Sequence, residues 1–312
     1  MLKRIRIMDV PNKRSSHDVA VPKSGGLAIA ATFMIGVLVI YLLADRTMIS
    51  EKFFMGFVSS AFLIAIVSFY DDLNDISVFI RLISQTIAAS VVMIFGIVIY
   101  ELKIPWVGQV QFGFFGYIVT FLWIVGLTNA YNFMDGINGI AGGTAVIACI
   151  FFSVICVKNG SNFTYIISYT IVAGSLGFLV FNFPKGRLFM GNVGSNFLGF
   201  TLATMAIIAS LYDHSHTSMF VMPLLLFHFI YDTFFTFIRR FIRRENVFEA
   251  HRSHLYQLFN RLGYSQTTVS VFYFVVGIAQ GFGAWWMADI IGNKRVLVFI
   301  PYLIFQIIYS II

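Results

Sequence analysis

Ten apolar runs, each long enough to cross a lipid bilayer, divide this sequence almost from end to end. A helix needs about 20 mostly apolar residues to cross a hydrocarbon core about 30 Å thick. Backbone polar groups in lipid must find partners within their own segment, so the runs are expected to be helices. The sequence therefore predicts an all-α, polytopic membrane protein with about ten transmembrane helices. The runs are residues 25–44, 53–70, 78–100, 113–128, 137–157, 162–181, 193–211, 218–239, 268–290 and 295–312.

The charge of the chain supports this class and suggests an orientation. Charged residues make up 11% of the 312 residues, against about 25% in a typical soluble domain. A net charge of +7 would suggest nucleic-acid binding in a soluble protein, but here no nucleic-acid partner is expected. With ten spans, one side of the membrane holds 15 of the 21 Lys and Arg residues. Because cytoplasmic loops carry such an excess, that side is expected to be cytoplasmic. No linker or repeat interrupts residues 1–312, which are expected to form a single membrane domain.

Five polar stretches fall on this same side. They are PNKRSSHDVAVPKSGG (11–26), YDDLNDIS (70–77), NAYNFMDGINGIAGG (129–143), NFPKGRLFMGNVGS (182–195) and RRFIRRENVFEAHRSHLYQ (239–257). Any one of them could be a solvated connector. Five on one face indicate a shared polar site at the cytoplasmic surface of the membrane.

The paired acids Asp71 and Asp72 close the second run. Adjacent carboxylates at the C-terminal end of a helix oppose its dipole, which is unfavourable unless they have a use as a base or a cation site. The alternative is a helix end that is exposed to water, and under either interpretation the two acids are expected outside the core. Arg81 follows after a turn and can fold back toward them.

Amides and histidines dominate two of the other stretches. Asn129, Asn132, Asp135 and Asn138 recur every three residues, which would place them near one face of a helix. Asn side chains can bind a base edge or offer a carbonyl oxygen to a cation. His251 and His254 flank Arg252, and two histidines alone are a weak sign of a metal site. Because four arginines precede them, phosphate or pyrophosphate binding is the better interpretation.

Taken together, PNKRSSH, DD, NAYNFMDGINGIAGG, FMGNVGSNFLGF and HRSHLYQ resemble the motifs of the polyprenyl-phosphate N-acetylhexosamine-1-phosphate transferases. That family includes the phospho-N-acetylmuramoyl-pentapeptide translocase, and HRSHLYQ is most similar to its bacterial branch that initiates O-antigen and related glycans. The resemblance implies Mg²⁺-dependent transfer of a sugar 1-phosphate from a UDP-N-acetyl sugar to a polyprenyl phosphate, with release of UMP. Mn²⁺ could replace Mg²⁺. It also implies an active site on the cytoplasmic face of a bacterial inner membrane.

The resemblance also implies a role for each candidate residue. Asp71 and Asp72 would orient or deprotonate the lipid phosphate, with Arg81 helping to hold it. Asn132 and Asn192 would be the metal ligands. The substrate-binding residues would be Asn129 beside the uridine segment Asp135, Gly136 and Asn138, with Phe189 stacking on uracil and His251, Arg252 and His254 holding the diphosphate and sugar.

Two features depart from the family pattern. Members carry one more helix before the PNKRSSH segment, which is missing here through truncation or a different start. The family motif G-D-x-G-S has Asn192 in place of its aspartate, and a neutral amide is a weaker ligand for Mg²⁺ than a carboxylate. Natural tolerance and an engineered substitution that slows turnover both remain open. So do a catalytically impaired scaffold of the same fold and a secondary transporter, for which Asp232 is the deepest acid. The sequence identifies neither the sugar nor the oligomeric state, a homodimer included.

Overall fold

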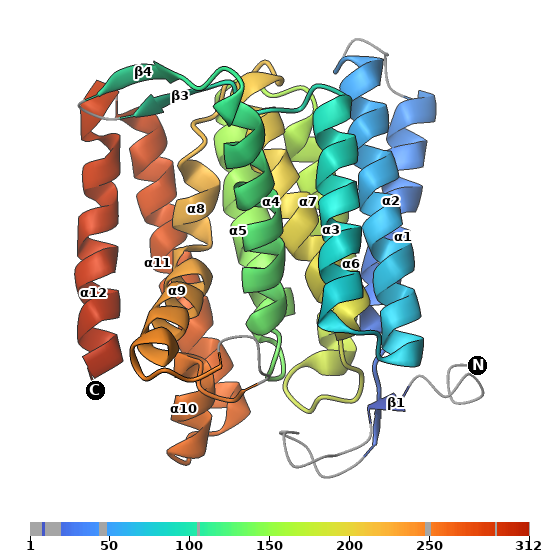
Figure 1. Cartoon of the computed structure of the whole chain (residues 1–312), viewed down its shortest axis with the longest axis vertical. Coiled ribbons are helices and arrows are strands. Elements are labelled where there is room, and N and C mark those ends of the chain that lie inside the picture. Colours follow the sequence, from blue (N-terminus) through green and yellow to red (C-terminus); the bar gives the residue numbers. More distant parts are fainter. Residues whose placement is uncertain are drawn as a thin grey trace.

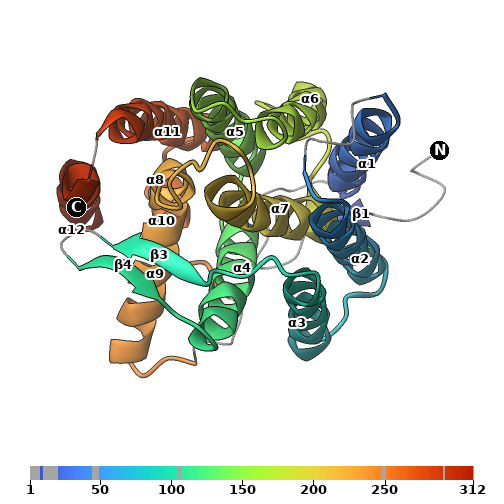
Figure 2. The ribbon, with the colours of Figure 1, turned by 90° about the horizontal axis from the view of Figure 1, so that it is seen from above.

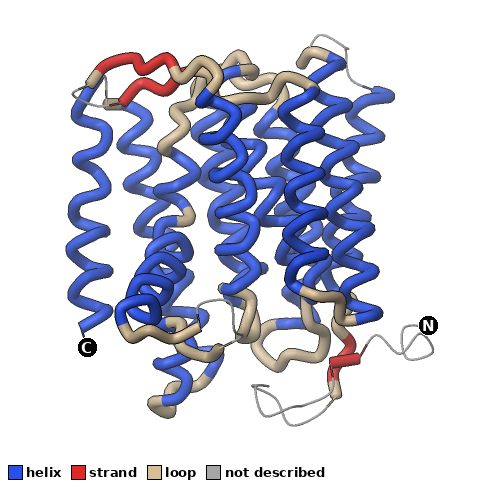
Figure 3. Tube along the Cα trace, viewed as in Figure 1, coloured by secondary structure: helices blue, strands red, loops and turns tan. Residues whose placement is uncertain are grey.

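The computed structural model of the protein describes residues 8–9, 20–43, 49–104, 107–246, 251–290 and 292–311. Within these residues the chain is a bundle of helices, as the apolar runs predict (Figure 3). The longer helices are α1 (Gly25–Leu43), α2 (Glu51–Asn74), α3 (Val78–Ile94), α4 (Phe115–Phe133), α5 (Ile140–Lys158), α6 (Thr164–Asn182), α7 (Gly191–Leu211), α9 (Phe227–Ile242), α11 (Gln266–Asp289) and α12 (Phe299–Ile311). The shorter helices are α8 (Val221–Leu225), α10 (Leu255–Arg261) and the 3₁₀ helix η2 (Gly292–Val298).

Two small antiparallel hairpins lie at opposite ends of the bundle (Figure 1). In one, β1 (Met8–Asp9) pairs with β2 (Val21–Pro22). In the other, β3 (Glu101–Ile104) pairs with β4 (Gly108–Gln111), so that Glu101 faces Gln111. The end that carries β1 also carries α10 and the connections after α2, α4 and α6 (Figure 1). We call it the polar end and define it by residues 70–77, 134–139, 183–190 and 251–254.

Helix α7 forms the centre of the bundle. Figure 2 shows it surrounded by neighbouring helices, and it packs against α1, α2 and α4. Of its most apolar stretch, 94% is buried. Small residues allow this close packing, because a side chain at Gly26 of α1 would collide with the backbone of Gly194 of α7. The first turn of α7, which contains Asn192, is thereby held firmly at the polar end.

Seven helices of the described part are long and apolar enough to span a membrane. They are Gly25–Leu43, Glu51–Asn74, Ile140–Lys158, Thr164–Asn182, Gly191–Leu211, Gln266–Asp289 and Lys294–Ile311. The other three predicted runs form α3, α4 and the pair α8 and α9. The boundaries of all three differ from prediction. Helix α4, in run 113–128, extends five residues further to Phe133. The helix in run 78–100 ends at Ile94, just before Gly96, whose φ of 93° favours glycine. The helix in run 218–239 is interrupted at Leu226.

The interruption at Leu226 separates α8, whose side chains are mostly buried, from α9, which has the opposite polarity of a soluble helix. The outward face of α9 is apolar and includes Phe234, Phe237, Ile238, Phe241 and Ile242. Its buried face is largely polar and, at a spacing of four residues, carries His228, Asp232, Thr236 and Arg240. Such an inverted helix suits a lipid-exposed position around a polar interior. Figure 2 shows α9 extending outward from α8.

Candidate functional site

The paired acids lie at the polar end, and both are buried. Asp71 is 1% exposed and Asp72 is 3% exposed. The expectation that they lie outside the core is therefore wrong, as is the alternative of a water-exposed helix end. Helix α2 ends beside them with Asp75 in a left-handed conformation (φ 46°), whose N–H donates to the carbonyl of Asp71 at 2.8 Å. This sharp turn directs both carboxylates toward α7.

Asp72 caps the N-terminus of α7. Its Oδ1 accepts a hydrogen bond from the backbone N–H of Asn192 at 2.9 Å, and its Oδ2 accepts one from Val193 at 3.0 Å. Backbone N–H groups at a helix N-terminus lack partners within the helix and carry partial positive charge, so a carboxylate there is favourable. Gly191 has φ 70°, and a Cβ at that position would lie 2.5 Å from Asp72 Oδ2. The glycine of the motif thus makes room for the cap.

Asp71 contacts side chains as well as backbone. Arg81 Nε lies 2.8 Å from Asp71 Oδ2, and the N–H is not aimed along this line, so the contact is an ion pair without a well-aligned hydrogen bond. The amide Nδ2 of Asn192 donates to the same oxygen at 2.8 Å, and the backbone N–H of Ile76 donates to Oδ1 at 3.0 Å. The structure therefore brings Arg81 back to the acids and places position 192 against Asp71.

The two predicted metal ligands are neighbours. Asn132 Nδ2 donates to Asn192 Oδ1 at 3.1 Å and to Ser195 Oγ at 2.7 Å. The Oδ1 of Asn132 has no hydrogen-bond partner within the described residues. The side-chain amide of Asn192 therefore links Asn132 to Asp71, since its oxygen accepts from Asn132 and its nitrogen donates to Asp71.

Asp135 follows α4 in the connection to α5. Its carboxylate has no hydrogen bond or ion pair to another described residue. Burial, and to a lesser degree the charge of Asp72, raises the pKa of Asp135 from its ordinary 3.8 to about 7. An acid in this state lacks a positive partner, and a bound cation would lower its pKa.

The hydrogen bonds join Asp71, Asn192 and Asn132 in a row, and their carboxylate and amide oxygens are ligand types that a hard divalent cation accepts. Mg²⁺ is commonly held by one or two carboxylates together with substrate phosphates and waters. No group of three or more His, Cys, Asp or Glu residues suited to a metal occurs within the described ranges. A cation here would therefore depend on amides and on the substrate's own phosphates.

The expected single helical face of Asn129, Asn132, Asp135 and Asn138 is wrong. Helix α4 ends at Phe133, so Asp135 and Asn138 lie in the connection, which Gly139 closes with φ 85°. The side-chain amide of Asn138 donates to the backbone carbonyl of Pro184 at 3.3 Å, and the backbone carbonyl of Asn138 accepts a hydrogen bond from Ser270 Oγ at 2.6 Å. Asn138 thus joins three segments of the polar end.

Gly136 and Asn129 have different surroundings again. A side chain at Gly136 would collide with the hydroxyl of Tyr256, which donates to the carbonyl of Phe133 at 3.0 Å. Asn129 lies deeper in the bundle, where its Nδ2 donates to Gln85 Oε1 at 2.6 Å. Gln85 also bonds to Asn196 at 3.5 Å, and the three amides form a network between α3, α4 and α7. Gln85 and Asn196 were not among the residues predicted from the sequence. An amide inside an apolar run could have identified both of them.

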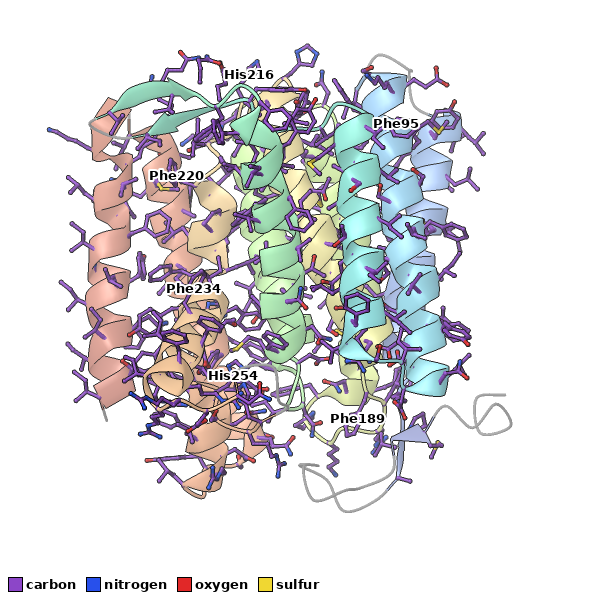
Figure 4. The ribbon with its side chains drawn as sticks, viewed as in Figure 1. Phe95, Phe189, His216, Phe220, Phe234 and His254 are labelled. Atoms are coloured by element: carbon purple, nitrogen blue, oxygen red, sulfur yellow. The ribbon has the colours of Figure 1, made fainter. Side chains whose placement is uncertain are left out.

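The histidine segment lies beside the end of α4. Figure 4 shows His254 and Phe189 at the polar end. The ring of His254 lies 6.0 Å from that of Phe133 and 5.0 Å from that of His251. Burial, with a smaller contribution from the charges of the nearby arginines, lowers the pKa of His251 to about 4, so His251 is neutral at pH 7. Arg252 is partly exposed. Its charge acts against the rise that burial causes in the pKa of Tyr256.

Phe189 has a backbone role in addition to any contact of its ring. Its N–H donates to the carbonyl of Pro22 at 2.8 Å, and its carbonyl accepts a bond from Gly25 at 2.8 Å. These bonds attach the segment before α1 to the connection before α7. The side chain is partly exposed at the polar end. The PNKRSSH motif itself lies outside the described residues.

Comparison with known proteins gives consistent matches. A family model described as glycosyl transferase family 4 matches residues 54–210, which include Asp71, Asn132 and Asn192. The chain is 29% identical to a Bacillus subtilis protein named probable undecaprenyl-phosphate N-acetylglucosaminyl 1-phosphate transferase, over 89% of this chain and 77% of that protein. It is 30% identical to the undecaprenyl-phosphate alpha-N-acetylglucosaminyl 1-phosphate transferase of Thermotoga maritima, over 90% and 84% of the two chains. A phospho-N-acetylmuramoyl-pentapeptide-transferase of Leuconostoc citreum matches over 41% of each chain at 34% identity.

Proposed function

Because the chain belongs to glycosyl transferase family 4, we propose that it transfers an N-acetylated sugar 1-phosphate from a UDP-sugar to a polyprenyl phosphate and releases UMP. The relatives named for undecaprenyl phosphate and N-acetylglucosamine favour these as the acceptor and the sugar. The observation that carries the proposal is the cluster of Asp71, Arg81, Asn132 and Asn192 at one end of a membrane bundle. A lipid phosphate and a water-soluble nucleotide can meet only at such an interface.

In the proposed orientation the polar end faces the cytoplasm of a bacterial inner membrane and the chain crosses the bilayer ten times, with α8 and α9 together making one crossing. The excess of Lys and Arg at this end supports the orientation. The nucleotide sugar then arrives from the cytoplasm, while the polyprenyl tail stays in the bilayer and its phosphate reaches the interface near Arg81.

In the proposed reaction an oxygen of the lipid phosphate forms a bond to the phosphorus that carries the sugar. The bond from that phosphorus to the bridging oxygen of UDP breaks, and the electron pair leaves with UMP. A proton on the lipid phosphate passes to a carboxylate. Mg²⁺, when bound, would supply charge stabilisation for the diphosphate. Arg81 would orient the acceptor, and Asn132 and Asn192 would hold the cation.

Asp71 is the better candidate for the base. Both oxygens of Asp72 bind backbone N–H groups of α7, and a proton on Asp72 would weaken that cap. Asp71 instead binds the side chains of Arg81 and Asn192, which can turn toward a substrate. Asp72 then positions the first turn of α7, which carries Asn192.

A transfer assay tests the proposal. Purified protein would receive undecaprenyl phosphate, Mg²⁺ and radiolabelled UDP-N-acetyl sugars, and lipid-linked label and UMP would be measured. We expect transfer from UDP-N-acetylglucosamine, and its loss in Asp71→Asn. Transfer only by Asn192→Asp would identify the native chain as an impaired member. No transfer by either form with any of the sugars would contradict the proposal.

A transporter gains no support from Asp232. This acid accepts hydrogen bonds from five protein donors, so its oxygens are already occupied.

A further inference from the structure

A single buried carboxylate joins three helices beside the histidine segment. Asp232 lies on the polar inner face of α9, six residues after the interruption at Leu226, and it is 1% exposed. Its oxygens accept bonds from Thr236 Oγ1 (3.1 Å), His254 Nδ1 (3.1 Å), Leu255 N (2.9 Å), Tyr256 N (3.3 Å) and Tyr273 OH (3.3 Å). These donors belong to α9, to α11 and to the start of α10.

The bonds to the start of α10 fix the position of its first residues. The N–H groups of Leu255 and Tyr256 are the free donors of the first turn of α10, and Asp232 satisfies both. Gln257 Oε1 accepts from the backbone N–H of His254 at 3.3 Å. The backbone of His254 is therefore anchored to α9 on one side and to its own helix on the other.

The bond to the ring of His254 fixes which nitrogen carries hydrogen. A carboxylate only accepts hydrogen bonds, so Nδ1 of His254 must be the protonated nitrogen in this contact. The other nitrogen, Nε2, has no hydrogen-bond partner among the described residues. The rings of Phe133 and His251 pack against that of His254, with centroids 6.0 and 5.0 Å away and each inclined to it by 29°. These neighbours restrict rotation of the imidazole.

We propose that Asp232 is a positioning residue, which holds His254 with Nδ1–H turned into the bundle and Nε2 presented as a hydrogen-bond acceptor to the hydroxyl or amide groups of the sugar of the nucleotide sugar. The proposal rests on the proposed function for the ligand of Nε2, and on the structure for the contact itself. A carboxylate behind a histidine commonly fixes both its tautomer and its orientation, and losing such a partner costs about 10- to 100-fold in metal affinity or activity at metal sites.

The chain offers a matched control in Asp213, near the opposite end of the bundle. Asp213 is also 1% exposed, and it accepts bonds from the N–H of Asn162 (3.3 Å), Thr164 Oγ1 (2.9 Å) and Ser215 Oγ (2.8 Å). Asp213→Asn removes a buried charge with similar partners but touches no histidine. It therefore reports the general cost of such a change.

A spectroscopic measurement tests the contact without relying on activity. In protein labelled with ¹⁵N-histidine, the signals of His254 are assigned by their absence in His254→Asn. We expect hydrogen on Nδ1 in the native protein and in Asp213→Asn, and a shift of hydrogen toward Nε2 in Asp232→Asn. An unprotonated Nδ1 in the native protein would overturn the proposal, even where Asp232→Asn fails to fold.

A double-mutant cycle tests the consequence for the reaction. His254→Asn keeps a donor near the position of Nδ1 and removes Nε2. The contacts of Asp232 with the start of α10 should therefore be preserved. We expect Asp232→Asn to lower kcat/KM for the UDP-sugar by at least about 10-fold, with KM for polyprenyl phosphate unchanged. In the His254→Asn background the same change should have no further effect. An equal further loss there, or an equal loss in Asp213→Asn, would reduce Asp232 to a structural residue. If neither the native chain nor Asn192→Asp transfers a sugar phosphate, the proposed function fails while the ¹⁵N result still decides the role of Asp232.

Discussion

Position 192 shows how one neutral side chain changes a site. Asn192 donates its amide hydrogen to Asp71 at 2.8 Å, so the two side chains attract each other without a cation. An aspartate at the same position would place two carboxylates in contact. Like charges at that distance repel unless a proton or a cation lies between them.

We therefore expect Asn192→Asp to make the site dependent on Mg²⁺. The melting temperature of this variant should rise with added Mg²⁺ more than that of the native protein, and its kcat should be higher by about 100-fold or more, within the range for electrostatic stabilisation. Thermal unfolding and steady-state rates across a Mg²⁺ titration would measure both, with Asn192→Ala as the control that lacks any ligand. Identical Mg²⁺ dependence in all three forms would remove position 192 from the metal site.

Asp135 predicts a pH dependence of stability. Its pKa is raised from 3.8 to about 7, so the folded protein binds a proton more tightly than the unfolded chain does. Between about pH 4 and pH 7 the stability should then fall as pH rises. Thermal unfolding of the native protein and of Asp135→Asn without Mg²⁺ would show this: the advantage of the variant should grow toward pH 7 and level off above it. A constant difference across this range would mean that Asp135 titrates normally.

At the scale of elements, the ends of α2 and α7 are joined through Asp72. We expect Asp72→Ala to lower stability by about 0.5–2 kcal/mol, the usual effect of losing a helix N-cap, and to lower turnover because the first turn of α7 holds Asn192. Asp71→Asn should lower turnover by at least about 100-fold, as loss of a general base does. Denaturant unfolding and the transfer assay would separate the two. A greater loss of stability in Asp71→Asn would reverse the assignment of base and cap.

The elements also show what the sequence could predict. The apolar runs predicted the helices, because backbone polar groups in lipid must form hydrogen bonds within their own segment. The five polar stretches predicted the polar end. The interruption at Leu226 could not be predicted, because the helix-disfavouring residue of this run, Pro223, disturbs the turn that precedes it rather than residue 226. The spacing of Asn129, Asn132, Asp135 and Asn138 resembled a helix, but Gly136 and Gly139 open the chain after Phe133. Contacts such as Asn192 with Asp71 join residues 121 positions apart, which no local pattern encodes.

At the scale of the whole molecule, the orientation of the polar end toward the cytoplasm can be tested by labelling. The native cysteines, Cys149 and Cys156, are buried, so an added surface cysteine should be labelled alone. We expect Lys185→Cys, at the polar end, to react with an impermeant thiol reagent in inverted membrane vesicles and not in intact cells. Val107→Cys, beside the β3–β4 hairpin, should show the opposite pattern. The reverse result for the pair would place the polar end outside the cytoplasm.

The burial of α7 limits where the molecule can move during turnover. A helix enclosed on all sides and tied at its first turn by Asp72 acts as a stator, because any displacement would disturb several packed neighbours at once. The moving part must lie at the periphery, where α9 meets lipid with an apolar face. We therefore expect bilayer thickness and fluidity to affect the rate through α9 and the histidine segment attached to it, while the geometry around Asn192 stays constant.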